Sequence, residues 1–457
     1  MRALYDSKSK LDDRGIKQLL SEKNKYQTWL ELEILLAKAQ AQVGFIPQNA
    51  ADEIAKIKFE DLNLERMVEI KEEVGHGFVP FLKIAVDACN PEGGKYLHYG
   101  ITTQNIQQTA QLYITKQVNE IFKKFLADIF QNLANLATNH ADTTMAGRTH
   151  GKHAIPITYG YKVSVWIQEL LDGVERLEGS EKRIFTVMMG GAVGAFNSTG
   201  ELGREVQEIM AQELAMSSMN VASRNMNQMK IEYLMNISLI CNTLHKMAEE
   251  VYYTGIEEYS ETSESFTKGT IGSSTMPQKV NPKLAKGIIA NTQKLYSLQN
   301  VGLYSSVRVF EADSSSYMLF DGLMEEGLEL VTEVLIRAEE LTRTLQVNQR
   351  KLLKNANLSG GLINSEFVMM KIAEKIGKDK AHAFMYEKAM QVGKDGKSYH
   401  EILVADEFLS SLYSQVEIET MLNPINYTGL SSVIALESAE KAWIKSNSLR
   451  EGNNDAI

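Results

Sequence analysis

Three short segments of the 457-residue chain carry polar residues of the kinds that could do acid–base or anion-binding chemistry. The first is GTIGSSTMPQKVNPKLA, residues 269–285, in which small residues precede Lys279 and Asn281. Glycine and serine free the backbone to present several N–H groups at one point, and Lys279 adds a full positive charge. Such a loop suits a carboxylate that gains negative charge during a reaction. The alternative interpretation is a flexible linker between domains.

A second polar segment, LHYGITTQN at residues 97–105, lies directly before a long stretch of helical pattern. It places His98, Thr102 and Thr103 where a helix begins. Unpaired N–H groups and the helix dipole both favour negative charge at that end, so this segment could bind an anion. The alternative is that Thr103 or Asn105 only caps the helix.

The third segment, AGRTHGKHAIP at residues 146–156, gathers Arg148, His150, Lys152 and His153 within six residues, between two helical stretches. The imidazole of His150 titrates near neutral pH, which suits proton transfer. For His153 we expect a surface or capping role.

The elements that must position these segments are long helices. Asn105 to Ala141 contains neither glycine nor proline, and Gln228 to Tyr259 contains only Gly255. Each stretch predicts a helix of about nine turns, or about 45 Å. A third such stretch runs from about Tyr317 to Asn355. Helices of this length must pack against similar partners, so we expect a bundle within one chain or between chains.

Shorter helices flank this central part. From Tyr26 to Val43 apolar residues recur every three or four positions, and Gly44 supplies a stop signal. Asn49 is placed to cap the next helix. After SGG at residues 359–361 the pattern changes to shorter helices joined by loops. We therefore predict three helical domains, at residues 1–100, 101–355 and 356–457.

Composition argues against several classes of function. The formal net charge is −10 with no basic block, which argues against nucleic acid as the main partner. No apolar run approaches the ~18–20 residues that cross a bilayer, and the N-terminus shows no secretory signal, so we expect a cytoplasmic location. Cys89 and Cys241 have neither a pairing pattern nor metal-ligand spacing, which predicts no disulfide and no zinc site.

The three polar segments resemble those of a known family. GSSTMPQKVNP, residues 272–282, resembles the signature loop of the fumarase/aspartase superfamily. HYGITTQN and GRTHGKHAIPITYGYK resemble the two other shared regions of that superfamily, in the same order. The chain is most similar to the adenylosuccinate lyase and 3-carboxy-cis,cis-muconate cycloisomerase branches. That likeness lies in RTHGKHAIPITYGYKVSVW and in residues 357–387, NLSGGLINSEFVMMKIAEKIGKDKAHAFMYE.

The resemblance implies a fold, an assembly and a reaction. The family fold is all-α, with three helical domains whose long central helices form the core of a homotetramer, and each active site is built from three subunits. The family reaction removes a proton next to a carboxylate and expels a group from the neighbouring carbon. It usually gives fumarate from a small anionic substrate, and we expect no metal or organic cofactor.

The resemblance also implies roles for residues of this chain. Ser273 matches the catalytic base, and His150 matches the histidine that protonates the leaving group or assists its departure. Removal of the proton next to the carboxylate gives a doubly charged intermediate, which positive groups and N–H donors must stabilise. The positions that match these stabilising groups are Lys279, Asn281 and the backbone of residues 272–275. The further positions that match substrate-binding residues, or histidines near the site, are His76, His98, Thr102, Thr103, Thr149 and Ser274.

Several positions depart from the adenylosuccinate lyase pattern. Asn105 stands where those enzymes usually carry aspartate, and Gln108 stands where they carry another. SRNMNQMK, Ser223 to Lys230, replaces an Arg-Asp-Arg stretch, and Glu311-Ala312-Asp313 replaces Glu-Arg-Asp. Because the family arginines help to hold a nucleotide phosphate, their loss argues against a purine substrate.

We expect a lyase that releases fumarate by splitting a C–N bond in a succinyl-type substrate, as in adenylosuccinate lyase. Arg224 and Arg308 could supply substitute cations or lie on the surface. Gln278 matches argininosuccinate lyases, so an N-succinyl amine without a nucleotide is an alternative substrate. A muconate-type cycloisomerase is a second alternative. The third is a catalytically silent structural relative, which the intact Ser273 and His150 argue against.

Overall fold

The computed structural model describes residues 11–265, 275–276, 278–311, 313, 315, 319, 322–394 and 396–451. Over these residues most of the chain is helical, with six short strands, so the predicted all-α class is confirmed. The chain folds into two compact units. Unit 1 comprises residues 1–124, 173–241 and 290–336, and unit 2 comprises residues 125–172, 242–289 and 337–457. The division into three domains stays a prediction.

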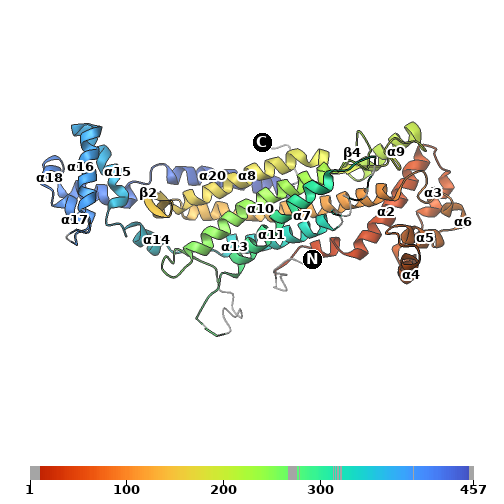
Figure 1. Ribbon diagram of the computed structural model, residues 1–457, viewed down its shortest axis with the longest axis horizontal. Coiled ribbons are helices and arrows are strands. Elements are labelled where there is room, and N and C mark those ends of the chain that lie inside the picture. Colours follow the sequence, from red (N-terminus) through yellow and green to blue (C-terminus); the bar gives the residue numbers. More distant parts are fainter. Residues whose placement is uncertain are drawn as a thin grey trace. The chain divides into compact units, whose positions relative to one another are not determined.

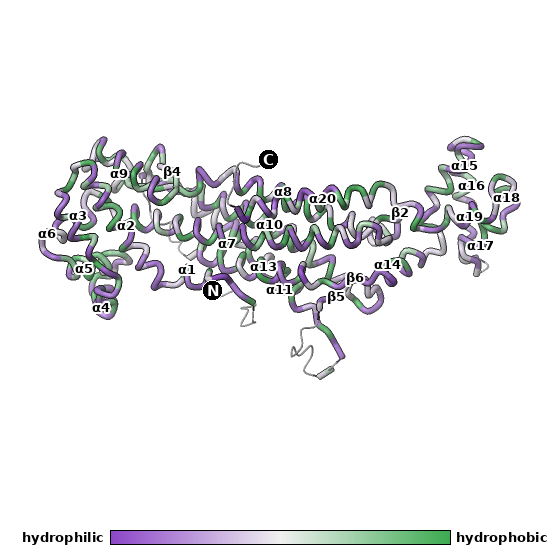
Figure 2. Tube along the Cα trace, turned by 180° about the vertical axis from the view of Figure 1, so that it is seen from behind, coloured by the Kyte–Doolittle hydropathy of each residue, from purple (hydrophilic) through white to green (hydrophobic). Residues whose placement is uncertain are grey.

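Long helices contribute residues to both units (Figure 1). Hydrophobic and hydrophilic residues alternate along them every few positions, as expected of helices that bury one face (Figure 2). No helix among the described residues combines the length and the apolar character needed to cross a membrane. These helices are α7 (Thr103–Asn139), α8 (Tyr159–Ile184), α10 (Gln228–Thr254), α11 (Lys283–Ser306) and α13 (Leu323–Thr344).

The long helices confirm the predictions in part. α7 has 37 residues and matches the stretch without glycine or proline. α10 ends at Thr254, directly before Gly255, and is therefore shorter than predicted. The third predicted stretch is not one helix, because α13 ends at Thr344 and strand β6 (Gln346–Val347) follows it. β6 pairs with β5 (Thr262–Ser263), so a contact far along the chain breaks the helical pattern.

Unit 1 has its own hydrophobic core, built on α2 (Glu22–Gln42). Trp29 packs against the rings of Phe78 and Phe81, with ring centroids 4.6 and 5.4 Å away. The other short elements of this unit are α1 (Ile16–Leu19), α3 (Gln48–Ile54), η1 (Phe59–Asp61), α4 (Leu64–Val74), α5 (Val79–Asp87), α6 (Pro91–Gly94), β3 (Thr186–Val187), α9 (Gly200–Glu213) and β4 (Ser217–Ser218).

The ends of α2 and α3 test the capping predictions. α2 ends at Gln42, and Gly44 follows with a φ of 73°, as the stop signal predicts. The prediction for Asn49 is wrong, since α3 begins at Gln48 and Asn49 lies inside its first turn. Pro47 holds the position before the helix in an extended conformation, without a side-chain cap. The fixed φ of proline suits that entry, so α3 starts two residues earlier than predicted.

Unit 2 contains an antiparallel hairpin and most of the short helices (Figure 1). The short helices predicted after residue 361 are confirmed, and they bury a separate cluster around Tyr399 and Val368. The elements are β1 (Thr144–Thr149), β2 (Lys152–Thr158), α14 (Gln349–Ala356), η2 (Leu362–Asn364), α15 (Ser365–Ile376), α16 (Lys378–Gln391), α17 (Tyr399–Val404), α18 (Glu407–Leu412), α19 (Gln415–Leu422), η3 (Pro424–Asn426) and α20 (Ser431–Glu451).

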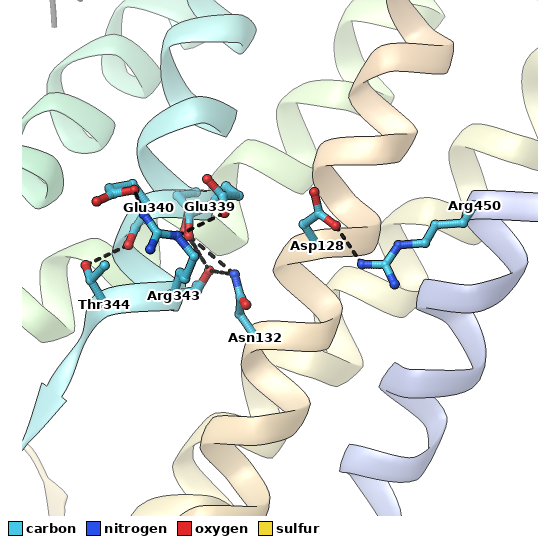
Figure 3. A network of polar contacts seen from close by, with 9 residues as sticks. Asp128, Asn132, Glu339, Glu340, Arg343, Thr344 and Arg450 are labelled. Carbon is cyan, nitrogen blue, oxygen red and sulfur yellow. Dashed lines mark hydrogen bonds and ion pairs between the residues drawn. The ribbon is translucent and has the colours of Figure 1, made fainter. Parts of the chain in front are cut away.

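The last helix, α20, is longer than the sequence pattern suggested and packs against α7 within unit 2. The hydroxyl of Ser446 donates to the carbonyl of Ala127 over 2.7 Å, and Arg450 pairs with Asp128 over 2.6 Å (Figure 3). On another side of α7, the amide of Asn132 donates to the carbonyl of Glu339 on α13 over 3.4 Å. These polar contacts fix the two helices against the C-terminal half of α7.

Candidate functional site

The predicted site residues fall into two groups, each described within its own unit. Ser273 and Ser274 lie outside the described residues. Unit 1 holds His76, His98, Thr102 and Thr103, and unit 2 holds Thr149, His150, Lys279 and Asn281.

His150 lies at the tip of the β1–β2 hairpin. Thr149 and Lys152 are paired across the two strands, which leaves His150 and Gly151 as the turn. Their φ angles are 51° and 73°, and a two-residue hairpin turn of type I′ requires positive φ at both positions. A left-handed conformation costs a residue with a Cβ roughly 1–2 kcal/mol. Histidine is therefore a strained choice at this position, and its side chain is exposed.

A buried ion pair anchors this hairpin. Arg148 donates to both carboxylate oxygens of Glu261, with Nη1–Oε2 at 3.0 Å and Nη2–Oε1 at 2.5 Å. Glu261 is only 1% exposed and also accepts from the side-chain amide of Asn355 over 2.8 Å. The guanidinium lies over the ring of Tyr259, 5.4 Å from its centroid. Burial lowers the pKa of Arg148, but Glu261 outweighs it and the net shift is upward, so the pair stays charged.

His153 lies across the hairpin from Arg148. Burial lowers the pKa of His153, and the positive charge of Arg148 lowers it further. The neutral form of the imidazole is therefore favoured. The surface or capping role expected for His153 stays a prediction.

Hydrogen bonds connect Glu264, which precedes the glycine-rich segment, to the last residues of that segment. The carboxylate of Glu264 accepts the backbone N–H groups of Leu284 and Ala285, at 3.0 and 2.7 Å. These are the first-turn donors of α11, so Glu264 acts as the anionic cap of that helix. Burial raises the pKa of Glu264, and the backbone donors oppose that shift. The choice between an ordered loop and a linker concerns residues outside the described ranges and stays open.

Two predicted residues of this segment are described. Lys279 is exposed, and Asn281 is half-buried. The backbone N–H of Lys279 donates to the carbonyl of Met276 over 3.0 Å. The side chain of Lys279 is thus accessible to solvent.

Asn105 lies in the first turn of α7, and its side chain contacts the backbone directly before the helix. Its side-chain oxygen accepts the backbone N–H of Thr102 over 3.1 Å, and its own N–H donates to the carbonyl of Thr102 over 2.8 Å. The same oxygen accepts the N–H of Gly191 over 3.1 Å. An uncharged amide oxygen thus accepts both of these N–H groups. The anion site at Thr102 and Thr103 stays a prediction.

His76 and His98 lie in the same part of unit 1. His76 Nδ1 accepts the backbone N–H groups of Phe78 and Val79, at 3.0 and 3.1 Å. The ring of Phe78 lies 5.6 Å from the ring of His98. His98 Nδ1 lies 2.6 Å from Oε1 of Glu33 on α2. His98 also lines a cavity of about 460 Å³ whose other lining residues include Arg66 and Lys83.

Arg224 and Arg308 lie in one polar cluster of unit 1. Arg308 donates to the carbonyl of Arg224 and to the side-chain oxygen of Asn227. Arg224 donates to the carbonyl of Ala192 over 3.3 Å. Lys230 is fully buried beside them, and burial lowers its pKa to about 7. Both arginines therefore brace backbone around the stretch that replaces the family Arg-Asp-Arg sequence.

Close backbone approach brings this cluster near the start of α7. A Cβ on Gly194 would lie 2.5 Å from the carbonyl oxygen of Ala222, so only glycine fits there. The same glycine-rich turn contains Gly191, which donates to Asn105. The start of α7 and the region around Arg224 are thus neighbours within unit 1.

Sequence reasoning missed three acidic residues that hold predicted site residues or their segments. Glu33, Glu261 and Glu264 act through contacts with residues far along the chain. Only Glu33 had a local signal, because it is a charged residue on the apolar face of α2, four positions after Trp29.

Family comparisons cover most of the chain. A family described as Lyase matches residues 12–293, and one described as Adenylosuccinate lyase C-terminus matches residues 361–437. N-acetyl-S-(2-succino)cysteine lyase of Dickeya dadantii (strain 3937) is 32% identical over 412 residues, which is 90% of each chain. Adenylosuccinate lyase of Methanocaldococcus jannaschii is 32% identical over 432 residues, 92% of each chain.

Solved structures share the fold. A fumarate lyase from Mesorhizobium sp. BNC1 is 28% identical with a TM-score of 0.86, covering 96% of this chain and 99% of the other. The 3-carboxy-cis,cis-muconate lactonizing enzyme from Pseudomonas putida has a TM-score of 0.87 at 22% identity, covering 95% and 98%. At that identity the likeness shows the fold alone. The chain belongs to the lyase family of the fumarase/aspartase superfamily, in the branch of adenylosuccinate lyase and 3-carboxy-cis,cis-muconate cycloisomerase.

Proposed function

We propose that this enzyme releases fumarate from a substrate in which a succinyl group is bonded to a heteroatom. The observation that supports this most is in the sequence, where Ser273, Lys279, Asn281 and His150 all match the family positions, and the hairpin of His150 is anchored by the Arg148–Glu261 pair. Relatives of 32% identity are named for succinyl compounds, as in N-acetyl-S-(2-succino)cysteine lyase.

In this proposal Ser273 takes a proton from the carbon next to a carboxylate. The electron pair forms the C=C bond of fumarate, and the bond to the heteroatom on the neighbouring carbon breaks. His150 gives a proton to the leaving atom or assists its departure, so the products are fumarate and a neutral amine or thiol. Lys279 and Asn281 stabilise the doubly charged intermediate.

The substrate carboxylates are held, in the same proposal, by hydroxyl groups. A serine base works only when positive groups and N–H donors stabilise its alkoxide. The hydroxyl groups that hold the substrate carboxylates belong to Thr102, Thr103, Thr149 and Ser274.

Two leaving atoms are candidates. Nitrogen follows from the likeness to adenylosuccinate lyase. Sulfur is favoured by a separate observation, because two relatives of 32% and 33% identity are named N-acetyl-S-(2-succino)cysteine lyase. The bracing contacts of Arg224 and Arg308 with backbone also support a substrate without a nucleotide phosphate.

We also propose that the enzyme is a homotetramer whose active sites combine residues of three subunits. Exposed apolar side chains support assembly: Tyr304 and Val307 near the end of α11 are 74% and 69% exposed. Surfaces of this kind are typical of protein contacts. Light scattering with size-exclusion chromatography gives the mass, and a monomer at assay concentration contradicts the shared site.

A substrate panel tests the function. Purified enzyme is mixed separately with N-acetyl-S-(2-succino)cysteine, adenylosuccinate, argininosuccinate and 3-carboxy-cis,cis-muconate. Fumarate is followed by its ultraviolet absorbance, and the lactone of the last reaction by chromatography. We expect fumarate from a succinyl compound, and the substrate with the highest kcat/KM identifies the leaving atom. Lactone formation without fumarate overturns the proposal.

A further inference from the structure

Unit 1 contains a carboxylate and an imidazole in a close pair. Glu33 lies in the middle of α2 and is 0% exposed. Its Oε1 is 2.6 Å from His98 Nδ1, a distance typical of a charge-assisted hydrogen bond. The two residues are 65 positions apart in the sequence. The pair therefore exists only because α2 packs against the segment before α7.

The carboxylate of Glu33 depends on this imidazole. Burying a carboxylate costs several kcal/mol unless a partner offsets the lost hydration. The second oxygen, Oε2, is buried and has no hydrogen-bond partner among the described residues. His98 is therefore the group that makes a carboxylate tolerable at this position. An apolar residue would fill the apolar face of α2 at lower cost, so packing alone does not explain Glu33.

His98 itself is held in a demanding conformation. Its φ is 60°, a left-handed backbone that costs a residue other than glycine about 1–3 kcal/mol. Its ring packs against Phe78 at an interplanar angle of 39°. With Nδ1 bound to Glu33, the other nitrogen, Nε2, is buried without a hydrogen-bond partner among the described residues. The strained backbone, the packed ring and Glu33 together hold His98 with Nε2 as its one unpaired ring nitrogen among the described residues.

We propose that Glu33 is a positioning residue that accepts the Nδ1–H of His98 and thereby directs Nε2 toward the substrate. A histidine that donates from one ring nitrogen to a carboxylate has a fixed tautomer and a fixed ring orientation. Nε2 then exchanges a hydrogen bond or a proton with the polar group it meets. This inference rests on the proposed function and on the family resemblance, which places His98 among the positions near the substrate.

The first test reads the ring of His98 in the wild-type protein. The eight histidines are labelled with ¹⁵N, and the His98 signals are assigned by their loss in H98Q. We expect the wild-type ring to carry its proton on Nδ1, as the neutral tautomer or as imidazolium. A wild-type His98 with a bare Nδ1 and a proton only on Nε2 overturns the inference, whatever the enzyme's activity.

The second test is kinetic and compares E33Q with E31Q. Glu31 is an exposed residue of the same helix and contacts Gln27, so E31Q is a matched control. We expect E33Q to lower kcat/KM by roughly 10- to 100-fold, the loss seen when other ring-orienting partners of histidine are removed. E31Q leaves kcat/KM unchanged. Equal activity of E33Q and E31Q overturns the inference.

A double variant shows whether Glu33 acts through His98. We expect E33Q/H98Q to be no less active than H98Q, because residues that work as a unit have non-additive effects. Multiplied losses in the double variant contradict the inference. Circular dichroism checks that each variant folds, and E33D replaces E33Q if the latter does not. A wild-type enzyme inactive on the whole panel refutes the proposed function, whereas the tautomer of His98 still decides the pairing.

Discussion

Arg148 and Glu261 form a bidentate ion pair in unit 2, although they lie 113 positions apart in the sequence. Arg148 is at the end of β1, two residues before His150. Glu261 lies directly before β5 and three residues before Glu264, which caps α11. One buried contact therefore joins the hairpin that carries His150 to the chain that leads into the glycine-rich segment.

Removing the charge of Glu261 should lower both the stability of unit 2 and the activity of the enzyme. In E261Q the guanidinium of Arg148 loses its partner, and breaking a buried pair from one side costs about 3 kcal/mol or more. Urea denaturation should show a lower midpoint, and kcat/KM should fall even where the protein is fully folded. The exposed pair Lys371–Glu374 is the control, since E374Q should leave both quantities nearly unchanged. An E261Q midpoint equal to that of E374Q would contradict the anchoring role.

Replacing Ser273 by alanine should abolish fumarate release while the fold is kept. The substitution removes the proposed base and nothing larger, so the circular dichroism spectrum and the thermal midpoint should match those of the wild type. Stopped assays at long times measure the residual rate. Full activity of S273A means that another group removes the proton.

His150 should show a trade-off between stability and activity. Asparagine is favoured at positive φ in hairpin turns, so H150N should raise the free energy of unfolding by a few tenths of a kcal/mol, up to about 1 kcal/mol. The same substitution removes the imidazole, and kcat should fall by roughly 100-fold or more. H153N is the control, because His153 is held neutral and lies outside the turn. A larger activity loss in H153N than in H150N would reverse the two assignments.

Lys230 should make the free energy of unfolding depend on pH in the alkaline range. Burial lowers its pKa from 10.5 to about 7, so between these values the unfolded state binds a proton that the folded state does not. The free energy of unfolding should therefore rise as pH rises from about 7 to about 10.5. Below pH 7 the full cost of the buried charge is present, on the order of 5 kcal/mol.

Replacing Lys230 by methionine tests that dependence. K230M should be more stable than the wild type at pH 7, and its urea midpoint should rise less between pH 7 and pH 10. K71M, at an exposed lysine of α4, controls for the loss of one positive charge. Parallel pH profiles of K230M and the wild type would show that Lys230 is not the group responsible.

Local sequence determined the elements whose causes are local. The absence of glycine and proline predicted α7 to within two residues at each end, because helix propensity and periodicity act over a few turns. Gly44 marked the end of α2 for the same reason. The three polar segments were sufficient to indicate the family, since their residue types follow from the chemistry they serve.

Only the tertiary structure decided how the candidate residues are held. The turn that carries His150 is part of a hairpin, and β6 interrupts the third predicted helix, because strand pairing depends on a distant partner. Glu33 meets His98, and Arg148 meets Glu261, only after the segments that carry them have packed. A sequence alone does not show which partner a charged residue on an apolar helix face will contact. In the folded chain it must find a partner, since the cost of burying it alone is too high.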